Sequence, residues 1–550
     1  MSADDILVSG MSGRFPLSAN TDEFAKNLFD GIDMVTDDDS RWLMGLYDIS
    51  NRMGKIDDYK HFDSSFFGLM EQMVDEIDPQ SRMLLEVSYE AMLDAGLNPQ
   101  TLRGSRTGVY VGVSQYAMTD GYPEDVQPDS RENLKTVMLQ NLSNMKTFYA
   151  SRISFANDFK GPSMIVDTAC SASLSAMCLA YNDLKLGYTD SAIVCGTHML
   201  FEPFISQYQQ ELSVCSPRGV SAVLDQKADG FVKGEAVCCL FLQRRRDARR
   251  NYAHVRSARM NVDGHKKMGM FFPSSEAHEQ LMMMSYEDAK IDPRDMTYFE
   301  CHATGTKAGD PQEIKAIYNA YCKSTGRTDP LPIGVLKSNM GHAEAGSGVA
   351  SVIKILISYE NECIPPNINL NTIKDEIAQY FPPLLAIQEK YPYQPGVNNF
   401  GIGGSNAHVL LEPNYKLGTD DGLSIAQTIP RIVNICGRTQ QSVKHIMDFI
   451  ENNTTKITND FLALLSDTMK SIPAVNSSGM PNRGSIIIKK MNEENNEIKY
   501  EYKKQMGVLK GKGLRPLWLL FPGLGGQWPA MLTILGIVCA ILKPSSVPNL

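Results

Sequence analysis

The most constraining feature of this sequence is a cysteine at a predicted strand-to-helix turn, within VDTACSASLSAMCLAY at residues 166–181. An apolar, strand-like run ends at Val166, and Cys170 follows after Asp-Thr-Ala. Apolar residues then recur every three or four positions until Gly187, a spacing that predicts a helix. A thiol at this turn lies at the positive end of the helix dipole, where unpaired backbone N–H groups favour the thiolate.

The predicted helix is apolar almost all round, which indicates that it is buried and holds Cys170 rigidly. Its periodic apolar residues are Leu174, Met177, Tyr181 and Leu184. A buried cysteine is also commonly an inert, small apolar side chain. This stretch alone therefore leaves two interpretations open, and the rest of the sequence is needed to choose between them.

Composition sets the class of protein. The 550 residues predict two to four domains, or one large double domain with additions. The net charge of −10 argues against nucleic acid or an anionic membrane surface as the main partner. Eleven cysteines without a C-x-x-C pair, and a start without a signal peptide, predict reduced thiols in the cytosol. The longest apolar run, residues 531–542, is too short to span a bilayer.

Predicted strands and helices alternate along the chain, as in α/β proteins with buried sheets. Strands are predicted at residues 6–8, 107–114, 191–195, 236–242, 297–300 and 333–336. A small-residue turn is predicted at residues 9–13, and helices at residues 21–28 and 76–97.

Three further stretches carry histidine or glycine at predicted strand ends, where open α/β sheets build sites. In FECHATGTKAGDPQE (299–313), His302 follows a strand in a loop of small residues. In KSNMGHAEAGSGVAS (337–351), a strand ends at Lys337, a turn passes Gly341 and His342 opens a helix. NNFGIGGSNAHVLL (398–411) is a glycine loop that leads into a strand.

Cys170, His302 and His342 form a chemically sensible set, although a lone histidine in a loop is usually only a hydrogen-bonded side chain. A cysteine can take an acyl group from a thioester at little energetic cost, because one thioester replaces another. Two imidazoles could then bind the oxygen of a second thioester, where enolate charge develops during decarboxylation. A zinc site is the alternative, but no C-x-x-C or H-x-x-H spacing favours it.

The four signatures DTACSAS, CHATGTKAGDPQE, KSNMGHAE and NNFGIGGSNAH together resemble those of β-ketoacyl synthase (ketosynthase) domains. The similarity is greatest to the ketosynthase of animal or insect type I fatty acid synthase. LVSGMSGRFP near the start and IDPQSRMLLEVSYEA fit the same family, and the resemblance covers about residues 4–412.

The resemblance implies an α/β, thiolase-like fold of two duplicated halves in five layers, and a homodimer. It implies Cys170 as the acyl-accepting nucleophile, with His302 and His342 supporting decarboxylation of a malonyl thioester. Lys337 is implied as a further catalytic residue and Glu344 as a supporting one.

The resemblance also assigns residues that contact the substrate. Thr304 and Thr306 would hydrogen-bond the phosphopantetheine arm of a carrier protein, which Gly403 and Gly404 would also contact. Phe400 would be the gating aromatic residue, and its backbone N–H would form an oxyanion hole with that of Cys170.

The implied reaction is condensation of a Cys-bound acyl group with malonyl-carrier protein, which releases carbon dioxide and adds two carbons in fatty acid biosynthesis. The implied partners are acyl carrier protein and malonyl or acyl thioesters, with no covalently bound cofactor and no metal, in the cytoplasm. Three positions depart from the family pattern without removing a catalytic group: Ala303 for Gly, Phe271 for Thr and Leu224 for Phe. Phe271 is expected to add bulk near the active-site lid and to alter substrate scope.

We predict three segments: a ketosynthase domain at residues 1–412, a small α+β linker domain at 413–512, and a truncated start of an acyltransferase at 513–550. A hairpin is predicted at residues 485–503, with its turn at 492–495. RPLWLLFPGLGGQWPAM (515–531) resembles the first strand and glycine loop of an acyltransferase, but the G-x-S-x-G elbow is absent from the sequence. We therefore expect that this polypeptide is not a complete synthase.

Alternatives stay open for the arginines and for the function. The arginines at 244–246 and 249–250 predict a solvated helix face or a docking patch for an acidic carrier protein. The chain is either a condensing enzyme supplied by another chain, or a non-catalytic synthase fragment that acts through dimerisation. A degradative thiolase would need a second cysteine in the last glycine loop, and NNFGIGGSNAH has none.

Overall fold

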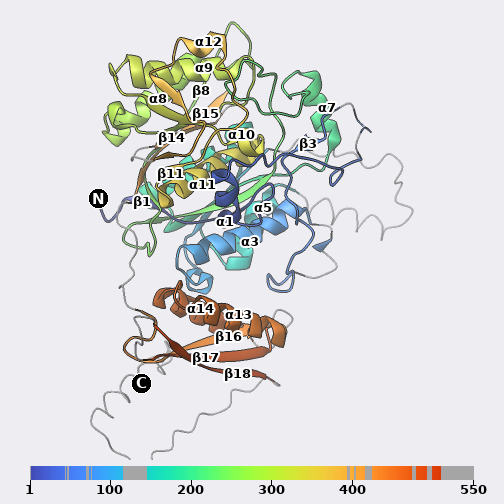
Figure 1. Ribbon diagram of the computed structural model, residues 1–550, viewed down its shortest axis with the longest axis vertical. Helices are drawn as coiled ribbons and strands as arrows, with labels where there is room; N and C mark the ends of the chain where they lie inside the picture. Colours follow the sequence, from blue (N-terminus) through green and yellow to red (C-terminus); the bar gives the residue numbers. More distant parts are fainter. Residues whose placement is uncertain are drawn as a thin grey trace, which may run out of the picture. The chain divides into compact units, whose positions relative to one another are not determined.

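The computed structural model describes residues 2–509 except 44, 46, 48, 70–73, 76, 115–144, 393–396, 402–403, 415–423, 474–478 and 492–497, and only the backbone at 397–401. The predicted acyltransferase start at 513–550 and the hairpin turn at 492–495 lie outside the described residues. Figure 1 shows the chain with its helices and strands.

The main sheet has eleven strands in the order β12-β10-β9-β14-β15-β8-β1-β7-β6-β4-β5. The first half of the chain supplies β1 (Ile6–Arg14), β4 (Gly108–Val113), β5 (Ser163–Val166), β6 (Ser191–His198) and β7 (Ala236–Arg244). The second half supplies β8 (Ala253–Val262), β9 (Phe299–Glu300), β10 (Leu331–Gly334), β12 (Leu384–Ala386), β14 (Val397–Gly401) and β15 (Ser405–Pro413). The halves join where β1 pairs with β8, Leu7 opposite His254.

The two halves repeat one strand plan. In the first half, β1 is antiparallel to β7 and β7 to β6, whereas β4 is parallel to both β6 and β5. In the second half, β8 is antiparallel to β15 and β15 to β14, whereas β9 is parallel to both β14 and β10. In this correspondence β5 is the equivalent of β10, and β4 of β9.

Helices separate and cover these strands in five layers. The central helices α6 (Ala172–Leu186) and α11 (Ser347–Glu360) contact strands of both halves. The helices α3 (Pro79–Asp94) and α5 (Thr147–Asn157) cover the first half, while α8 (Ser275–Ala289) and α9 (Gly309–Ile317) lie on the second (Figure 1). The predicted thiolase-like fold with duplicated halves is therefore confirmed.

Close backbone approaches explain the glycines of two strands. A Cβ on Gly112 of β4 would lie 2.3 Å from the Ser173 backbone of α6, so glycine lets that helix press onto the sheet. A Cβ on Gly10 would lie 2.0 Å from the Ala91 carbonyl oxygen of α3. The predicted turn at residues 9–13 is wrong for the same reason: its small residues continue β1 under a close-packed helix.

The strand predicted at 333–336 and ending at Lys337 needs correction, because β10 stops at Gly334. Lys337 instead opens a short helix, α10 (Lys337–Met340). The Asn367 side chain accepts the N–H of Val335 at 2.7 Å, and this bond replaces a strand partner. The central helix α11 then begins at Ser347, after His342 rather than at it.

Residues 431–508 form a separate small sheet. Its strands β16 (Arg431–Gly437), β17 (Asn482–Lys490) and β18 (Tyr500–Val508) are antiparallel, and the last two form the predicted hairpin. The helices α13 (Gln440–Asn453) and α14 (Asn459–Ser471) pack against β16. Val443 and Met447 of α13 lie in one buried cluster with Ile486 of β17, so this segment has its own core.

The remaining elements are short. They are α1 (Thr21–Phe29), β2 (Thr36–Asp37), β3 (Arg52–Met53), α7 (Pro203–Glu211), β11 (Cys363–Ile364), α12 (Asp375–Ala378) and β13 (Tyr391–Pro392), with short 3₁₀ and π turns between them. Within the described part of the chain, none of the helices combines the length and the apolar character needed to cross a bilayer.

The clustered arginines do not form the predicted helix face, because β7 runs to Arg244 and a turn follows. Arg244 is buried and donates to the carbonyl of Leu184, in the last turn of α6, and to that of Thr189, just after this helix. Arg250 pairs with Asp94 at 2.6 Å. Arg244 and Arg250 therefore make contacts within the chain, and the interpretation as a docking patch for a carrier protein stays a prediction.

Candidate active site

Cys170 lies where the sequence predicts it, between β5 and α6, in the single 3₁₀ turn η2 (Ala169–Ser171). The residue before it, Ala169, has a φ of +51°. This left-handed conformation costs a non-glycine residue about 1 kcal/mol or more, and strain of this kind is concentrated at functional sites. The predicted strand-to-helix turn therefore exists and is held in a strained form.

His342 faces the thiol from the other half of the molecule. Its Nε2 lies 3.1 Å from the Cys170 Sγ. Its ring also meets Phe231 edge to face, with ring centroids 5.1 Å apart. The Ser347 hydroxyl, at the start of α11, donates to the Cys170 carbonyl at 3.3 Å. The two central helices therefore bring together two residues that are distant in the sequence.

The sequence predicts a thiolate at Cys170, but the structure favours the protonated thiol. Burial raises the pKa of the Cys170 thiol to about 12, and the Glu344 carboxylate adds to this effect against Lys337 and Lys233. The sequence argument counted the helix dipole but could not count the removal of the thiol from water, which disfavours its charged form. Burial, followed by Lys337, lowers the pKa of His342 well below its usual value, so its imidazole is neutral and can accept a proton.

His302 lies across the His342 ring, with centroids 5.3 Å apart and planes at 88°. Glu313 of α9 fixes its loop, because Oε1 accepts the His302 N–H at 2.6 Å and Oε2 accepts the next N–H at 2.7 Å. One helical turn earlier, Asp310 accepts the N–H groups of Thr304 and Gly305, both at 3.1 Å. Two buried carboxylates of one helix thus hold the whole loop.

Lys337 and Glu344, which the sequence grouped together, lie in different charge environments. Burial lowers the pKa of Lys337 against the opposing effects of Glu313 and Glu300. Burial also raises the pKa of Glu313 to about 7, with Lys337 among the opposing influences. Glu344 pairs instead with Lys233, at 3.1 Å.

The structure describes only some of the residues assigned to substrate contacts. The Thr304 hydroxyl donates to that of Thr306 at 3.2 Å. The backbone of Phe400 lies in β14, opposite His408, but its side chain lies outside the described atoms, as does all of Gly403. Gly404 has a φ of +73°, and its carbonyl accepts the Asp263 N–H at 2.9 Å.

The three departures from the family pattern have distinct settings. Ala303 is buried with its N–H bonded to Glu313, so the loop is intact. Phe271 is 94% exposed on the segment between β8 and α8. Leu224 is buried at a φ of +60°, and its N–H donates to Asp310 at 3.1 Å.

Sequence reasoning missed three residues of the site: Asp310, Glu313 and Lys233. The first two were visible as acidic residues three apart in AGDPQE, at a helix start directly after the His302 loop. No local signal singles out Lys233, because its partner Glu344 is far along the chain. Among the described residues, no group of three or more His, Cys, Asp or Glu side chains could hold a metal ion.

Comparison with known protein families identifies the family to which this chain and its site belong. The description "Beta-ketoacyl synthase, N-terminal domain" matches residues 3–248, and "Beta-ketoacyl synthase, C-terminal domain" matches residues 252–371. The chain belongs to the β-ketoacyl synthase family. A third description, "Ketoacyl-synthetase C-terminal extension", matches residues 366–487. This ketosynthase is therefore an enzyme of the transferase class by family.

Curated relatives include both fatty acid and polyketide synthases. A fatty acid synthase from the goose Anser anser anser is 41% identical over 358 residues, which cover 65% of this chain and 99% of that sequence. A highly reducing polyketide synthase from Glarea lozoyensis is 37% identical over 391 residues, 68% of this chain. The matched region is 15% of the length of that polyketide synthase.

Solved structures agree with the fold. An oxazolomycin ketosynthase domain from Streptomyces albus has a TM-score of 0.77 and 26% identity, covering 88% of this chain and 85% of that one. The ketosynthase from module 6 of the bacillaene synthase of Bacillus subtilis has a TM-score of 0.73 and 28% identity, covering 88% and 82%.

Proposed function

We propose that this ketosynthase catalyses the decarboxylative condensation of a Cys170-bound acyl group with malonyl-carrier protein in fatty acid biosynthesis. The observation that carries the proposal is the 3.1 Å separation between the Cys170 Sγ and the His342 Nε2, with His302 across the imidazole. The 41% identity to a goose fatty acid synthase supports the fatty acid rather than the polyketide assignment.

In the first step, His342 accepts the thiol proton while the Cys170 sulfur attacks the carbonyl carbon of an acyl thioester. The bond from that carbon to the phosphopantetheine sulfur breaks, and the departing thiolate takes the proton from His342. A neutral imidazole is needed as the base because burial raises the pKa of the thiol to about 12. A Cys170 thioester and a free pantetheine thiol result.

In the second step, a malonyl thioester enters with its arm near the Thr304 and Thr306 hydroxyls. Its carboxylate leaves as carbon dioxide, and the electron pair forms an enolate whose oxygen accepts hydrogen bonds from His302 and from His342, which donates in this step as its Nε2–H tautomer. The enolate carbon then attacks the Cys170 thioester. The backbone N–H groups of Cys170 and Phe400 would bind the oxyanion, and the Cys170 sulfur leaves as a thiolate that takes a proton from water. Lys337 adds a buried positive charge beside this chemistry.

Intact-protein mass spectrometry tests the reaction class. Wild type and Cys170→Ala are incubated with octanoyl-pantetheine, and then with malonyl-pantetheine. We expect an octanoyl adduct on wild type alone, followed by malonyl-dependent release of a 3-oxodecanoyl thioester. A folded wild type without an adduct would favour the alternative, a non-catalytic fragment that acts through dimerisation.

The choice between fatty acid and polyketide synthesis is tested by the acyl group. A fatty acid ketosynthase receives fully reduced chains, because each β-carbon is reduced before the next condensation. We expect saturated octanoyl-pantetheine to acylate Cys170 faster than its 3-hydroxy and 2-enoyl counterparts. Equal rates with all three would favour a polyketide-type enzyme.

We propose a homodimer as the working form. β5 is the last strand of the main sheet, and Ser163 on it is exposed, so this edge can pair with a second copy. Light scattering should give twice the mass of one chain, and Met164→Lys on this edge should lower it. A monomeric wild type would contradict this proposal.

The domain boundaries and the location remain proposals. The match to a ketosynthase extension at 366–487 and the separate core around Ile486 support a linker domain at about residues 413–512. The acyltransferase start at 513–550 rests on its sequence alone. All ten described cysteines are free thiols, which supports a cytoplasmic location.

A further inference from the structure

A segment of the first half, Val232–Gly234, brackets the backbone of His342. The Val232 carbonyl accepts the His342 N–H at 2.7 Å, and the Gly234 N–H donates to the His342 carbonyl at 2.9 Å. Between them, Lys233 forms an isolated parallel bridge with His342. Gly341 has a φ of +76°, and a Cβ there would lie 2.9 Å from the Lys233 carbonyl oxygen. The two segments are thus in close contact through their backbones.

A buried ion pair joins the same two segments through their side chains. The Lys233 Nζ lies 3.1 Å from the Glu344 Oε1, with side-chain exposures of 5% and 9%. The same oxygen accepts the Gln209 amide N–H at 3.2 Å. The His198 Nε2 lies 3.8 Å from it. Glu344 itself sits at a φ of +35°, so this carboxylate is held in place against backbone preference.

Several ionisable groups influence the His342 imidazole, from different elements. Burial lowers its pKa most, Lys337, His198 and Lys233 lower it further, and Glu344 raises it. Cys170 and His302 face the ring directly. Burial lowers the pKa of His198 to about 4, against the opposing effect of Glu344. Without Lys233, the Glu344 carboxylate would favour an imidazolium at His342 more strongly, with Lys337 left as the lysine that opposes it.

We propose that Lys233 is a positioning residue of the condensation reaction: it holds the His342 loop through Glu344 and cancels the Glu344 charge beside the imidazole. The inference rests on the proposed function, because it assigns His342 the role of a base. It predicts that the charge of Lys233 matters more than its packing.

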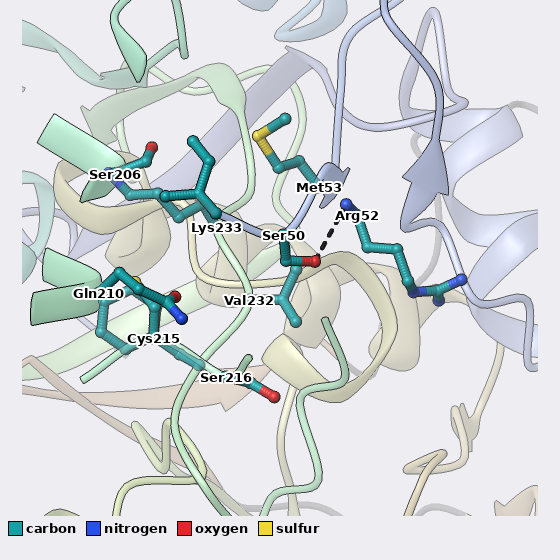
Figure 2. Close-up of a pocket in the computed structure, with 11 residues that line it drawn as sticks. Ser50, Arg52, Met53, Ser206, Gln210, Cys215, Ser216, Val232 and Lys233 are labelled. Atoms are coloured by element: carbon teal, nitrogen blue, oxygen red, sulfur yellow. Dashed lines mark hydrogen bonds between the residues drawn. The ribbon is translucent and has the colours of Figure 1, made fainter. Parts of the chain in front are cut away.

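The surroundings of Lys233 are partly polar and partly apolar. A pocket on the side of Lys233 is lined by Ser206, Gln210, Cys215 and Ser216 among others, and these side chains lie around Lys233 in Figure 2. Hydroxyl and amide groups share the wall with the lysine, as do the apolar residues Met53 and Phe231. A methionine of similar length would fill the same space without the charge, which makes Lys233→Met a suitable probe.

The experiment compares Lys233→Met, Lys233→Arg, Glu344→Gln and the double variant Lys233→Met/Glu344→Gln with wild type. Lys227→Met is the matched control, because Lys227 is exposed on the same connection between α7 and β7. The first measurement is a pH titration of ¹³Cε1-labelled histidines, with the His342 signal assigned from His342→Gln. The second is the pH dependence of Cys170 acylation by octanoyl-pantetheine.

We expect Lys233→Met to move the His342 titration and the acid limb of acylation to higher pH by about one unit or more, the usual effect of a nearby charge. At pH values below this acid limb the acylation rate then falls about tenfold, and at higher pH it changes little. Lys233→Arg and Lys227→Met should match wild type, and the double variant should return the limb toward its original position.

Two outcomes would overturn the inference. One is a His342 titration in Lys233→Met that superimposes on that of wild type. The other is an acylation loss equal at every pH and not relieved in the double variant, since this describes a purely structural lysine. A wild type that titrates normally but is never acylated would contradict the proposed function instead, and the histidine titration would still test Lys233.

Discussion

Cys170 and His342 follow equivalent strands, β5 and β10, in the two halves of the molecule. In the first half, one 3₁₀ turn with a strained Ala169 leads directly from the strand into α6. In the second half, the link to α11 is longer and carries α10 and a 3₁₀ turn, and with them Lys337, His342 and Glu344. The duplicated fold thus supplies one rigid nucleophile from one half and a charged, hydrogen-bonded set of groups from the other.

One strand plan thus gives two kinds of site. In the first half, the removal of the half-buried Cys170 thiol from water raises its pKa to about 12. The second half depends on buried carboxylates: Glu313 holds the His302 loop, and Glu300 accepts the Leu336 N–H at 2.6 Å next to Lys337. Substitutions in the two halves should therefore differ in their effects on reaction rates and on stability.

The largest expected effect separates the two histidines. His342→Asn should slow Cys170 acylation about 10²–10⁴-fold, because it removes the base beside the thiol. His302→Asn should leave acylation close to wild type while slowing malonyl decarboxylation about 10²-fold, because it removes a donor to the enolate. Stopped-flow acylation and carbon dioxide release measure the two steps. Equal losses in both steps for both variants would show that the histidines act as one unit.

The next effect concerns a buried ion pair of the second half. Lys354 and Glu300 lie 2.7 Å apart, and both side chains are fully buried. Lys354→Met leaves the Glu300 charge uncompensated, so the free energy of unfolding should fall by about 3–5 kcal/mol in urea denaturation. Lys160→Met, which breaks the exposed pair with Asp158, should cost below about 1 kcal/mol. Similar losses in the two variants would contradict the second half's dependence on buried charge.

Glu313→Gln gives a smaller loss with a pH signature. The amide can accept only one of the two N–H groups that Glu313 accepts, so we expect a loss of about 1–3 kcal/mol at pH 5. Burial raises the pKa of Glu313 to about 7, against an ordinary value of 4.5. A raised carboxyl pKa makes the folded state bind more protons than the unfolded state, so wild-type stability falls as the pH rises from about 4.5 to 7.

The Glu313→Gln variant should lack that fall, and its deficit relative to wild type should shrink toward pH 7. Thermal unfolding of both proteins between pH 4.5 and 8 measures the difference. A deficit that grows with pH would mean that the pKa of Glu313 is lowered in the folded protein, not raised.

The smallest effect is expected at Phe271. Because this side chain is 94% exposed, Phe271→Thr should change the free energy of unfolding by less than about 0.5 kcal/mol. Rates of Cys170 acylation by hexanoyl-, octanoyl- and palmitoyl-pantetheine test the expectation that Phe271 alters substrate scope. Identical chain-length profiles for the two proteins would remove that expectation.

The sequence predicts the parts of the site that local patterns encode. The apolar run before Cys170, the helix after it and the small-residue loop around His302 place these two residues correctly, whereas His342 precedes the helix it was expected to open. Contacts across the molecule decide the rest. The thiol pKa depends on burial between the two halves, the continuation of β1 past Gly10 depends on α3, and the Lys233–Glu344 pair joins residues with no local relationship.

The most direct test of the account is the protonation state of Cys170 at rest. Iodoacetamide alkylation of the Cys170 peptide is followed by mass spectrometry between pH 5 and 10 in wild type and His342→Asn. The account predicts a protonated thiol beside a neutral imidazole, so wild-type alkylation should still be rising at pH 10. A rate that reaches its plateau below pH 7, and loses that plateau in His342→Asn, would reveal a resting thiolate–imidazolium pair and contradict it.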